Sequence, residues 1–256
     1  MTVTTTEESC VMTFTQPNID QFLTNGYVVL RDGFSRAVAE AGRTFIWNRI
    51  GETWEGCQTS GQPMIHLQRN FKGAPFDQIM NPRLTQAIDE LLGAGRWRFD
   101  EGYGWWPILF PGFPGPGGWH IDGLARHRLA EPEKGLTTLF LFSDVGADDG
   151  GTPLVPGSHR TIARLLAAAE PSGLSGAELS KLLPQAPEPV VSVAGRAGDV
   201  AFLHPFLLHG FGPNTGGRIR FACNPLIRLV SPLNCRRADG AHSPVEEAVR
   251  RAVHDS

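Results

Sequence analysis

The chain reads GDVAFLHPFLLHGFGPNTGGRIRF from residue 198 to residue 221. Within it, Val200–Leu203 is a short apolar run typical of a buried strand, and residues 213–217 form a turn signal. After the turn, arginine alternates with apolar residues over 218–221, which is the pattern of a strand with one buried face. The stretch therefore predicts two antiparallel strands joined by a turn.

The arginines after the turn are candidates for binding a carboxylate. If the turn centres on Asn214 and Thr215, His209 lies opposite Arg220 and both face the same side. A guanidinium in that position can hold a carboxylate through two hydrogen bonds. Arg218 has the same strand parity and is the rival candidate, although its place beside the turn favours a solvent-exposed rim.

A second motif, GGWHIDG over residues 117–123, supplies a histidine and a carboxylate. Side chains two apart on a strand point to one face, so His120 and Asp122 can reach the same ion. With His209 as a third ligand, two imidazoles and one carboxylate would leave three positions of an octahedral ion open. That arrangement suits Fe(II) oxygen chemistry and differs from a closed structural zinc site.

The chain between residues 96 and 230 is dense in Gly, Pro, Trp and Phe and contains short apolar runs. Short strands separated by turns predict a mainly β sandwich or barrel. The runs expected to form strands are Tyr27–Arg31, Thr137–Phe142, Val190–Val193, Val200–Leu203 and Ile219–Cys223.

Helical patterns flank these strands. Two small ones, around 161–169 and 176–183, make residues 160–185 a helical insert and a lid candidate. Residues 1–16 are rich in Thr and have no periodicity, so we expect a loose arm there. The other helices are expected over Asn18–Gly26, Arg36–Ile50 and Pro82–Leu92.

Composition limits the function classes. The 256 residues are 41% apolar and 19% charged, which predicts a globular chain, and we expect one domain over 1–256. With a formal net charge of −3, the composition does not indicate the basic surface that nucleic-acid binding usually requires. Without a secretory signal pattern or a long apolar run, we expect no membrane partner and a cytoplasmic location. The widely spaced cysteines, expected as reduced thiols, are Cys10, Cys57, Cys223 and Cys235.

Three motifs together resemble the phytanoyl-CoA dioxygenase family. They are WHID at 119–122, GGTPLVPGSH at 150–159, and the stretch at 198–220 quoted above; FLTNGYVVLRDGF at 22–34 is similar to the family's opening helix and strand. The likeness spans roughly residues 18–228. It implies a double-stranded β-helix, a jelly-roll or cupin-like pair of antiparallel sheets, with Fe(II), 2-oxoglutarate and O₂ as cofactor and cosubstrates.

The resemblance also implies roles for individual residues. The family's last arginine, eleven positions after the distal histidine, binds the far carboxylate of 2-oxoglutarate, and this rule selects Arg220. Phe211 stands where some members have a serine that supports the cosubstrate, and Thr137 or Thr138 could replace that hydroxyl. Related halogenases lack the carboxylate ligand, so Asp122 argues against halogenation. Succinate and CO₂ are the expected coproducts, with hydroxylation of a C–H bond as the default outcome.

The substrate is expected to be a small, apolar or ring-bearing molecule. Trp105 and Trp106 lie in an aromatic run that leads into the iron motif and could wall an apolar pocket. Arg126 and Arg128 follow that motif and could hold an anionic substrate group, or could belong to a solvated loop. The oligomeric state stays open.

Two other functions compete with the oxygenase. One is a cupin-like isomerase or hydrolase that uses the same ligands with another divalent metal, and the other is a non-catalytic small-molecule-binding barrel. Neither accounts for Arg220 as well as an oxygenase does. Structural roles are expected for His66, His159 and His204, whereas His242 and His254, near the end of the chain, carry no signal.

Overall fold

A computed structural model describes residues 12–60, 63–99, 101–115, 118–123, 125–131 and 135–254, with the side chains of 51–60 not described. Among the helices of these residues, none has both the length and the apolar character needed to cross a bilayer.

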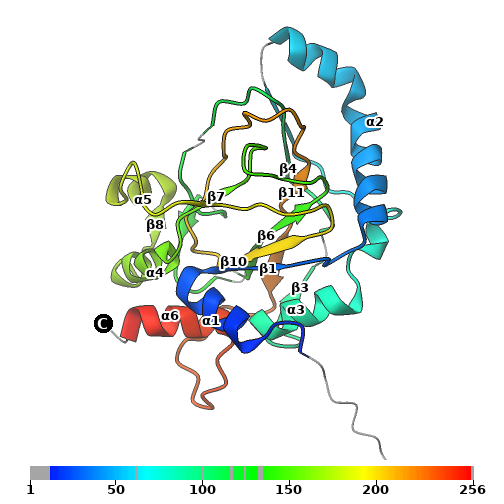
Figure 1. Cartoon of the computed structure of the whole chain (residues 1–256). Helices are drawn as coiled ribbons and strands as arrows, with labels where there is room; N and C mark the ends of the chain where they lie inside the picture. Colours follow the sequence, from blue (N-terminus) through cyan, green and yellow to red (C-terminus); the bar gives the residue numbers. More distant parts are fainter. Residues whose placement is uncertain are drawn as a thin grey trace, which may run out of the picture.

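A six-stranded antiparallel sheet forms the centre of the fold (Figure 1). Its hydrogen-bonded order is β1, β10, β6, β12, β3, and β11 pairs with β6 as well. All six residues of β6 are buried, so this strand lies in the core of the molecule. The bounds are β1 (Tyr27–Leu30), β3 (Trp97–Arg98), β6 (Leu136–Leu141), β10 (Val200–Leu203), β11 (Ala222–Cys223) and β12 (Leu226–Leu229).

Three short strand pairs and several single bridges lie around this sheet. The pairs are β2 (Met64–Leu67) with β4 (Trp106–Leu109), β5 (Arg126–His127) with β8 (Leu174–Ser175), and β7 (Pro153–Leu154) with β9 (Val191–Ser192). Isolated bridges join His120 to His209 and Leu109 to Arg220. The predicted mainly β class is confirmed, and the strands of the described residues do not close into a barrel.

Helices cover the outside of the sheet. Figure 1 shows α1, α3 and α6 along one side, α2 at one end, and α4 with α5 at the other end. Helix α6 contacts α1, α3 and α4, so it joins the two ends of this layer. The bounds are α1 (Gln16–Asn25), α2 (Arg36–Ser60), η1 (Phe76–Gln78), α3 (Pro82–Leu92), α4 (Ser158–Ala168), α5 (Gly176–Leu182) and α6 (Pro244–His254).

Most of the predicted elements form, because their signals are local. The helix expected over Pro82–Leu92 is α3, where the side chain of Asn81 accepts a hydrogen bond from the N–H of Leu84 and Gly93 ends the helix. Helix α2 continues ten residues beyond its predicted end at Ile50. We did not predict α6.

The predicted pairing of His209 with Arg220 is wrong. His209 forms bridges with His120 and Leu154, whereas Arg220 forms a bridge with Leu109. The segment between them does not make a tight hairpin, because Asn214 bridges to two other parts of the chain. Pairing with these other segments replaces the expected turn.

The end of the predicted loose arm is anchored. The N–H groups of Thr13 and Phe14 donate to the two carboxylate oxygens of Glu90 at 2.7 and 2.8 Å. The ring of Phe14 is buried against Phe202. Residues 1–11 lie outside the described residues.

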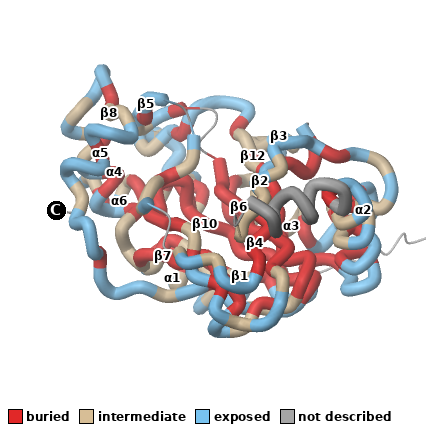
Figure 2. Tube along the Cα trace, turned by 90° about the horizontal axis from the view of Figure 1, so that it is seen from above, coloured by how far each residue is buried: buried red, intermediate tan, exposed pale blue. Residues whose placement is uncertain are grey.

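Burial is concentrated where the central sheet meets its helices (Figure 2). Aromatic rings fill much of this region, and Trp106 lies 4.7 Å from Phe142 and 5.8 Å from Phe76 between ring centroids. Packing of this density makes large-to-small changes costly and keeps the strands at fixed positions.

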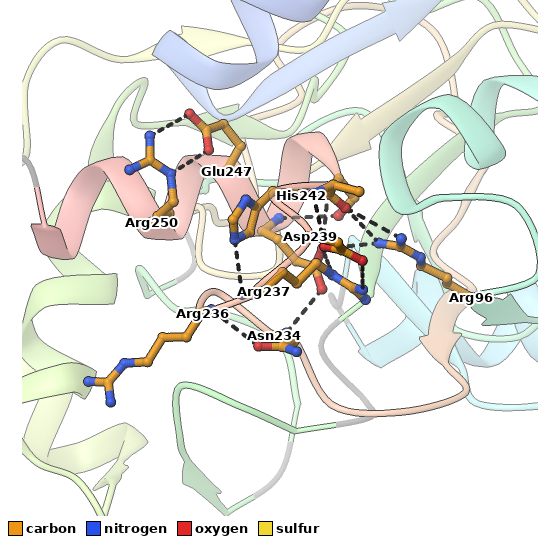
Figure 3. Close-up of polar contacts among 11 residues, drawn as sticks. Arg96, Asn234, Arg236, Arg237, Asp239, His242, Glu247 and Arg250 are labelled. Atoms are coloured by element: carbon orange, nitrogen blue, oxygen red, sulfur yellow. Dashed lines mark hydrogen bonds and ion pairs between the residues drawn. The ribbon is translucent and has the colours of Figure 1, made fainter.

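One buried carboxylate fastens the C-terminal segment to the rest of the fold. Glu246 in α6 accepts hydrogen bonds from Arg96 at 3.2 Å, from Arg237 at 3.0 Å, and from the N–H groups of Asn234 and Ser243 at 3.0 Å. Figure 3 shows Arg96, Arg237 and Asn234 close to this helix. Burial disfavours the charge of this carboxylate, but these donors outweigh burial and lower the pKa of Glu246.

Glu246→Ala should therefore destabilise the protein strongly, because it leaves two arginines and two N–H groups without their acceptor. We expect a loss of about 3 kcal/mol in the free energy of unfolding, measured by urea titration. Glu247→Ala is the matched control on the same helix. Its carboxylate pairs with the surface residues Arg250 and Arg251, so its loss should stay below about 1 kcal/mol. Equal losses in the two variants would contradict this role.

Two buried histidines lie side by side between α1, α4 and α6. The ring centroids of His159 and His204 are 5.0 Å apart. Nε2 of His159 donates to the carbonyl of Leu23 at 3.2 Å, and Nε2 of His204 donates to the carbonyl of Val245 at 3.3 Å. Burial lowers the pKa of His159 to about 4 and lowers that of His204 well below its usual range. Both rings are therefore neutral and structural, as we predicted.

Stability should fall in mild acid because of these rings. Below pH 6.5 the unfolded chain protonates His159, whereas the folded protein does not until about pH 4, so acid favours unfolding across this window. His159→Gln, neutral at every pH, should reduce the loss of unfolding free energy between pH 7 and pH 5 by about 2 kcal/mol. Urea titrations at the two pH values measure this, and an unchanged pH dependence would contradict it.

Candidate active site

A backbone bridge brings the two histidines of the predicted metal site together. The N–H of His120 donates to the carbonyl of His209 at 3.0 Å, and the N–H of His209 donates back at 3.0 Å. Their ring centroids are consequently 4.6 Å apart. The bridge joins the WHID motif to the motif that starts at Gly198.

Local hydrogen bonds orient each imidazole. Nδ1 of His120 donates to the carbonyl of Gly118, and Nδ1 of His209 donates to the carbonyl of Leu207, both at 2.9 Å. In its neutral form, each ring therefore has an unprotonated Nε2 that is available as a ligand. Asp122 lies between them, with its oxygens 3.7 Å from Nε2 of His120 and 3.5 Å from Nε2 of His209.

These three residues fit a divalent metal ion. Their ligand atoms all lie within 4.8 Å of one another. Two imidazole nitrogens and one carboxylate oxygen are a donor set for iron and similar transition metals. Burial lowers the pKa of His120, which favours the neutral ligand form. Burial also disfavours charged His209, but the neighbouring Asp122 carboxylate outweighs this and raises its pKa.

A cavity of about 410 Å³ opens onto the three side chains. Its walls combine apolar and polar groups, which is typical of small-molecule sites. The apolar lining is Trp105, Pro107, Phe211 and Leu226, and the polar lining beyond the metal set is His66, Glu101, Thr152, Asn224 and Arg228.

Arg220 contacts the wall of this cavity through Thr152. It is 1% exposed, and its guanidinium donates to the carbonyl of Gly150 and to the hydroxyl of Thr152, both at 3.1 Å. Its Nε has no hydrogen-bond partner, and no ion pair with it is present among the described residues. Burial lowers the pKa of Arg220 to about 10. The site thus contains a buried positive charge that an anion would stabilise.

Three other candidates for the cosubstrate have different roles in the structure. Arg218 is a surface residue that pairs with Asp149, with Nε 3.0 Å from the carboxylate. The hydroxyl of Thr138 donates to the carbonyl of Pro225. Thr137 is buried in β6, and neither threonine is among the described residues that line the cavity.

The two tryptophans lie in different surroundings: Trp106 is the first residue of β4, and Trp105, with a left-handed backbone, lies just before it. Trp105 lines the cavity and is 46% exposed. Trp106 is fully buried in the aromatic core, and its indole N–H donates to the carbonyl of Tyr103 at 3.1 Å. The expectation that Trp106 contacts substrate is therefore wrong.

The arginines after the iron motif fix loops instead of lining the cavity. Arg126 donates to the carbonyl of Gly173 at 2.8 Å and pairs with Glu178 at 3.3 Å. Arg128 donates to the carbonyl of Pro171 at 3.2 Å and pairs with Glu131 at 3.3 Å. Neither arginine is among the described residues that line the cavity, and that they hold a substrate anion stays a prediction.

The predicted helical insert, residues 160–185, is the part of the chain that Arg126 and Arg128 contact. A small cavity of about 40 Å³ separates His120 from Leu179 and Leu183 of the insert. Helix α4 is packed firmly through its buried residues Ile162 and Leu166. Among the described residues of the insert, Ile162 of α4 and the α5 region line this small cavity together with His120.

The sequence analysis missed several of the described cavity residues, Glu101 and Leu226 among them. Thr152 lies in the GGTP motif that we had quoted, so a hydroxyl beside Arg220 could have been suspected. His66 had been expected to be structural, but it lines the cavity with its ring 5.6 Å from the ring of Trp105. No local signal distinguishes Asn224 and Arg228, because their roles depend on which face of β12 meets the cavity.

His120, Asp122 and His209 could hold one metal ion as two histidines and one carboxylate, a donor set typical of mononuclear iron enzymes. A family model described as phytanoyl-CoA dioxygenase matches residues 58–222, well over half of the chain. The chain belongs to the phytanoyl-CoA dioxygenase family, whose members are Fe(II)- and 2-oxoglutarate-dependent oxygenases. A sequence comparison with curated proteins found no match.

Solved structures show the same fold at low identity. AviO1 from Streptomyces viridochromogenes Tue57 is 19% identical, with a TM-score of 0.51, over 85% of this chain and 96% of that chain. EvdO2 from Micromonospora carbonacea var. aurantiaca is 15% identical, with a TM-score of 0.53, over 86% and 92%. HygX from Streptomyces hygroscopicus, solved with nickel and 2-oxoglutarate bound, is 17% identical, with a TM-score of 0.53, over 85% and 88%.

Removal of one metal ligand should abolish tight Fe(II) binding. Asp122→Ala should lower the affinity at least about 100-fold, because loss of a direct ligand exceeds the effect of losing an outer-shell partner. Anaerobic calorimetric titration with Fe(II) measures this. His66→Ala, which changes another wall of the same cavity, is the matched control and should bind normally. Normal binding by Asp122→Ala would exclude this residue as a ligand.

Proposed function

We propose that the protein oxidises a C–H bond of a small, ring-bearing organic molecule, with hydroxylation as the default outcome and succinate and CO₂ as coproducts. His120, Asp122 and His209 hold Fe(II), and Arg220 binds the far carboxylate of 2-oxoglutarate. The observation that carries the proposal is a buried Arg220, without a carboxylate partner among the described residues, in contact with the wall of a cavity that contains the metal ligands.

The three ligands give the ion a fixed and partly open environment. When bound, Fe(II) with 2-oxoglutarate supplies the electrons and the site for O₂ activation. The carbonyls of Gly118 and Leu207 keep both imidazoles in the tautomer that ligates through Nε2. Because the three ligand atoms lie within 4.8 Å of one another, most of the 410 Å³ cavity is left for the two organic molecules.

Thr152 and Arg220 form the carboxylate end of the cosubstrate site. The Thr152 hydroxyl lines the cavity and already accepts a hydrogen bond from Arg220, so a carboxylate that binds there meets both groups. A guanidinium can make two parallel hydrogen bonds to a carboxylate. Burial strengthens this interaction, because few waters compete for the charges. Thr152 would also supply the hydroxyl that Phe211 lacks.

The apolar wall favours a substrate with a ring. Phe211 and Leu226 line the cavity, and Trp105 lies at its exposed side. Trp105 has a φ of +56°, which is unfavourable for a residue with a side chain, so the surrounding structure must hold it there. Such strained positions cluster at functional sites, and an indole presents a flat apolar face to a ring.

We further infer that the sheets form a double-stranded β-helix. The bridge between His120 and His209 and the bridge between Leu154 and His209 link the β7 region to the iron motif. Together with the central sheet, these links support two facing antiparallel layers with the metal ligands at one end.

Anaerobic titration tests the proposed function. Protein with Fe(II) should give a weak visible charge-transfer band on addition of 2-oxoglutarate, and the titration gives its Kd. Arg220→Ala should raise this Kd about 30-fold or more, because a charge-assisted hydrogen bond is worth about 2 kcal/mol. Arg218→Ala, which changes the nearby surface arginine, should leave it unchanged.

No band with the unaltered protein would overturn the oxygenase proposal. Tight binding of another divalent metal without a band would then favour the cupin-like enzyme, and binding of a small molecule without turnover would favour the non-catalytic barrel.

A further inference from the structure

We propose that His66 is a specificity-determining residue that forms a hydrogen bond with a hydroxyl group carried by a ring of the substrate. This ring lies against Phe211, and the C–H bond to be oxidised lies on the side of the ring that faces the metal ligands. The inference deepens the proposed function and rests on it, because it assigns the substrate end of the same cavity.

The pairing of β2 with β4 turns His66 toward the active-site cavity. His66 lies opposite Pro107 in this antiparallel pair, and both residues line the cavity. The next residue, Leu67, points the other way, since it lines a separate groove together with Phe45 of α2. Because side chains alternate along a strand and directly opposite residues share a face, the imidazole of His66 lies on the cavity side of this strand pair.

The imidazole of His66 is available to a ligand. The rings of His120, His209, His159 and His204 are each held by a hydrogen bond to a backbone carbonyl. His66 has no such hydrogen bond and no ion pair among the described residues, and it is exposed. A structural histidine usually pairs its ring nitrogens with the protein, so the free ring of His66 favours a role in binding.

Two aromatic rings hold the imidazole in place instead. The ring centroid of His66 is 5.6 Å from that of Trp105 and 6.4 Å from that of Phe211, and both neighbours line the cavity. Phe211 is in turn 6.2 Å from the ring of the metal ligand His120. Neighbouring rings thus run from the exposed Trp105, past His66 and Phe211, to the metal site. A flat ring placed on Phe211 is next to both His66 and a metal ligand.

The chemistry of a neutral imidazole matches a hydroxyl group. Burial lowers the pKa of His66, and the Asp122 carboxylate acts more weakly in the opposite direction. The ring is therefore neutral at pH 7 and has one donor nitrogen and one acceptor nitrogen. A hydroxyl both donates and accepts, so it can pair with whichever nitrogen it meets. A carbonyl or an ether only accepts and can use one of the two.

His66 differs in charge from the group that we assign to the cosubstrate. Arg220 is a permanent cation and, with Thr152, suits the carboxylate of 2-oxoglutarate. The neutral ring of His66 offers no charge to a carboxylate and so leaves that role to Arg220. Substitution of His66 should consequently change substrate recognition without changing the binding of 2-oxoglutarate.

Two probes test the inference, namely 5-indanol and indane. They have the same fused rings and differ by one hydroxyl, and their saturated carbons lie on the ring that does not carry it. Each is titrated calorimetrically into protein loaded anaerobically with Fe(II) and 2-oxoglutarate. We expect 5-indanol to bind at least about fivefold more tightly than indane, which is the effect of one additional hydrogen bond.

Three variants assign this preference to His66. His66→Phe keeps a ring beside Trp105 and Phe211 but removes both nitrogens, so the ratio of the two Kd values should fall about fivefold. His66→Gln supplies a donor and an acceptor without the ring and should retain a preference for 5-indanol. Leu226→Met, which changes another wall of the cavity without altering a polar atom, is the matched control and should keep the ratio.

The outcomes separate the two proposals. Equal binding of the two probes, no binding of either, or an unchanged ratio in His66→Phe overturns this inference, even if the charge-transfer band of 2-oxoglutarate is present. A raised Kd for 2-oxoglutarate in His66→Phe also overturns it, because His66 would then serve the cosubstrate. Absence of the band in the unaltered protein overturns the proposed function, and titration of the probes into the metal-free protein then shows whether His66 still selects the hydroxyl.

Discussion

The site depends on two backbone hydrogen bonds between His120 and His209. They join segments that are distant in sequence, and they set the two imidazoles side by side before any metal binds. Each ring is then fixed by a carbonyl of its own segment, so both Nε2 atoms face Asp122. Any change that separates the two segments would disperse the ligands, because no single element of the fold carries all three.

A second constraint is the buried charge of Arg220. The surrounding backbone and Thr152 satisfy part of its guanidinium, but no carboxylate of the described residues neutralises it. Arg218, two residues earlier, is neutralised by Asp149 at the surface. The two arginines have the same strand parity but differ in burial and in partner. Arg218 is exposed and paired with Asp149, whereas Arg220 is buried and has no carboxylate partner among the described residues. A buried cation is costly in the free protein and favours the binding of an anion.

The cavity between these features has an apolar wall and a polar wall. Aromatic and aliphatic side chains offer a surface for a ring, whereas Asn224 and Arg228 offer a polar surface whose charge Glu101 balances. Arg126 and Arg128 join the segment after the iron motif to the segment between α4 and α5 and do not line the cavity. Specificity for a substrate can therefore vary on one wall while the metal and cosubstrate end stays the same.

The sequence by itself determined the features that depend on near neighbours. The spacing of His120 and Asp122, the capped helix α3 and the apolar strands follow from local periodicity, and α6 could have been found from its apolar spacing. Only the tertiary structure decided which residues meet across the fold. It placed Arg220 opposite Leu109, turned Trp106 into the core and brought Thr152, Asn224 and Arg228 to the cavity. The reason is physical: local patterns fix which side chains share a face, but strand register and packing between distant segments fix what that face contacts.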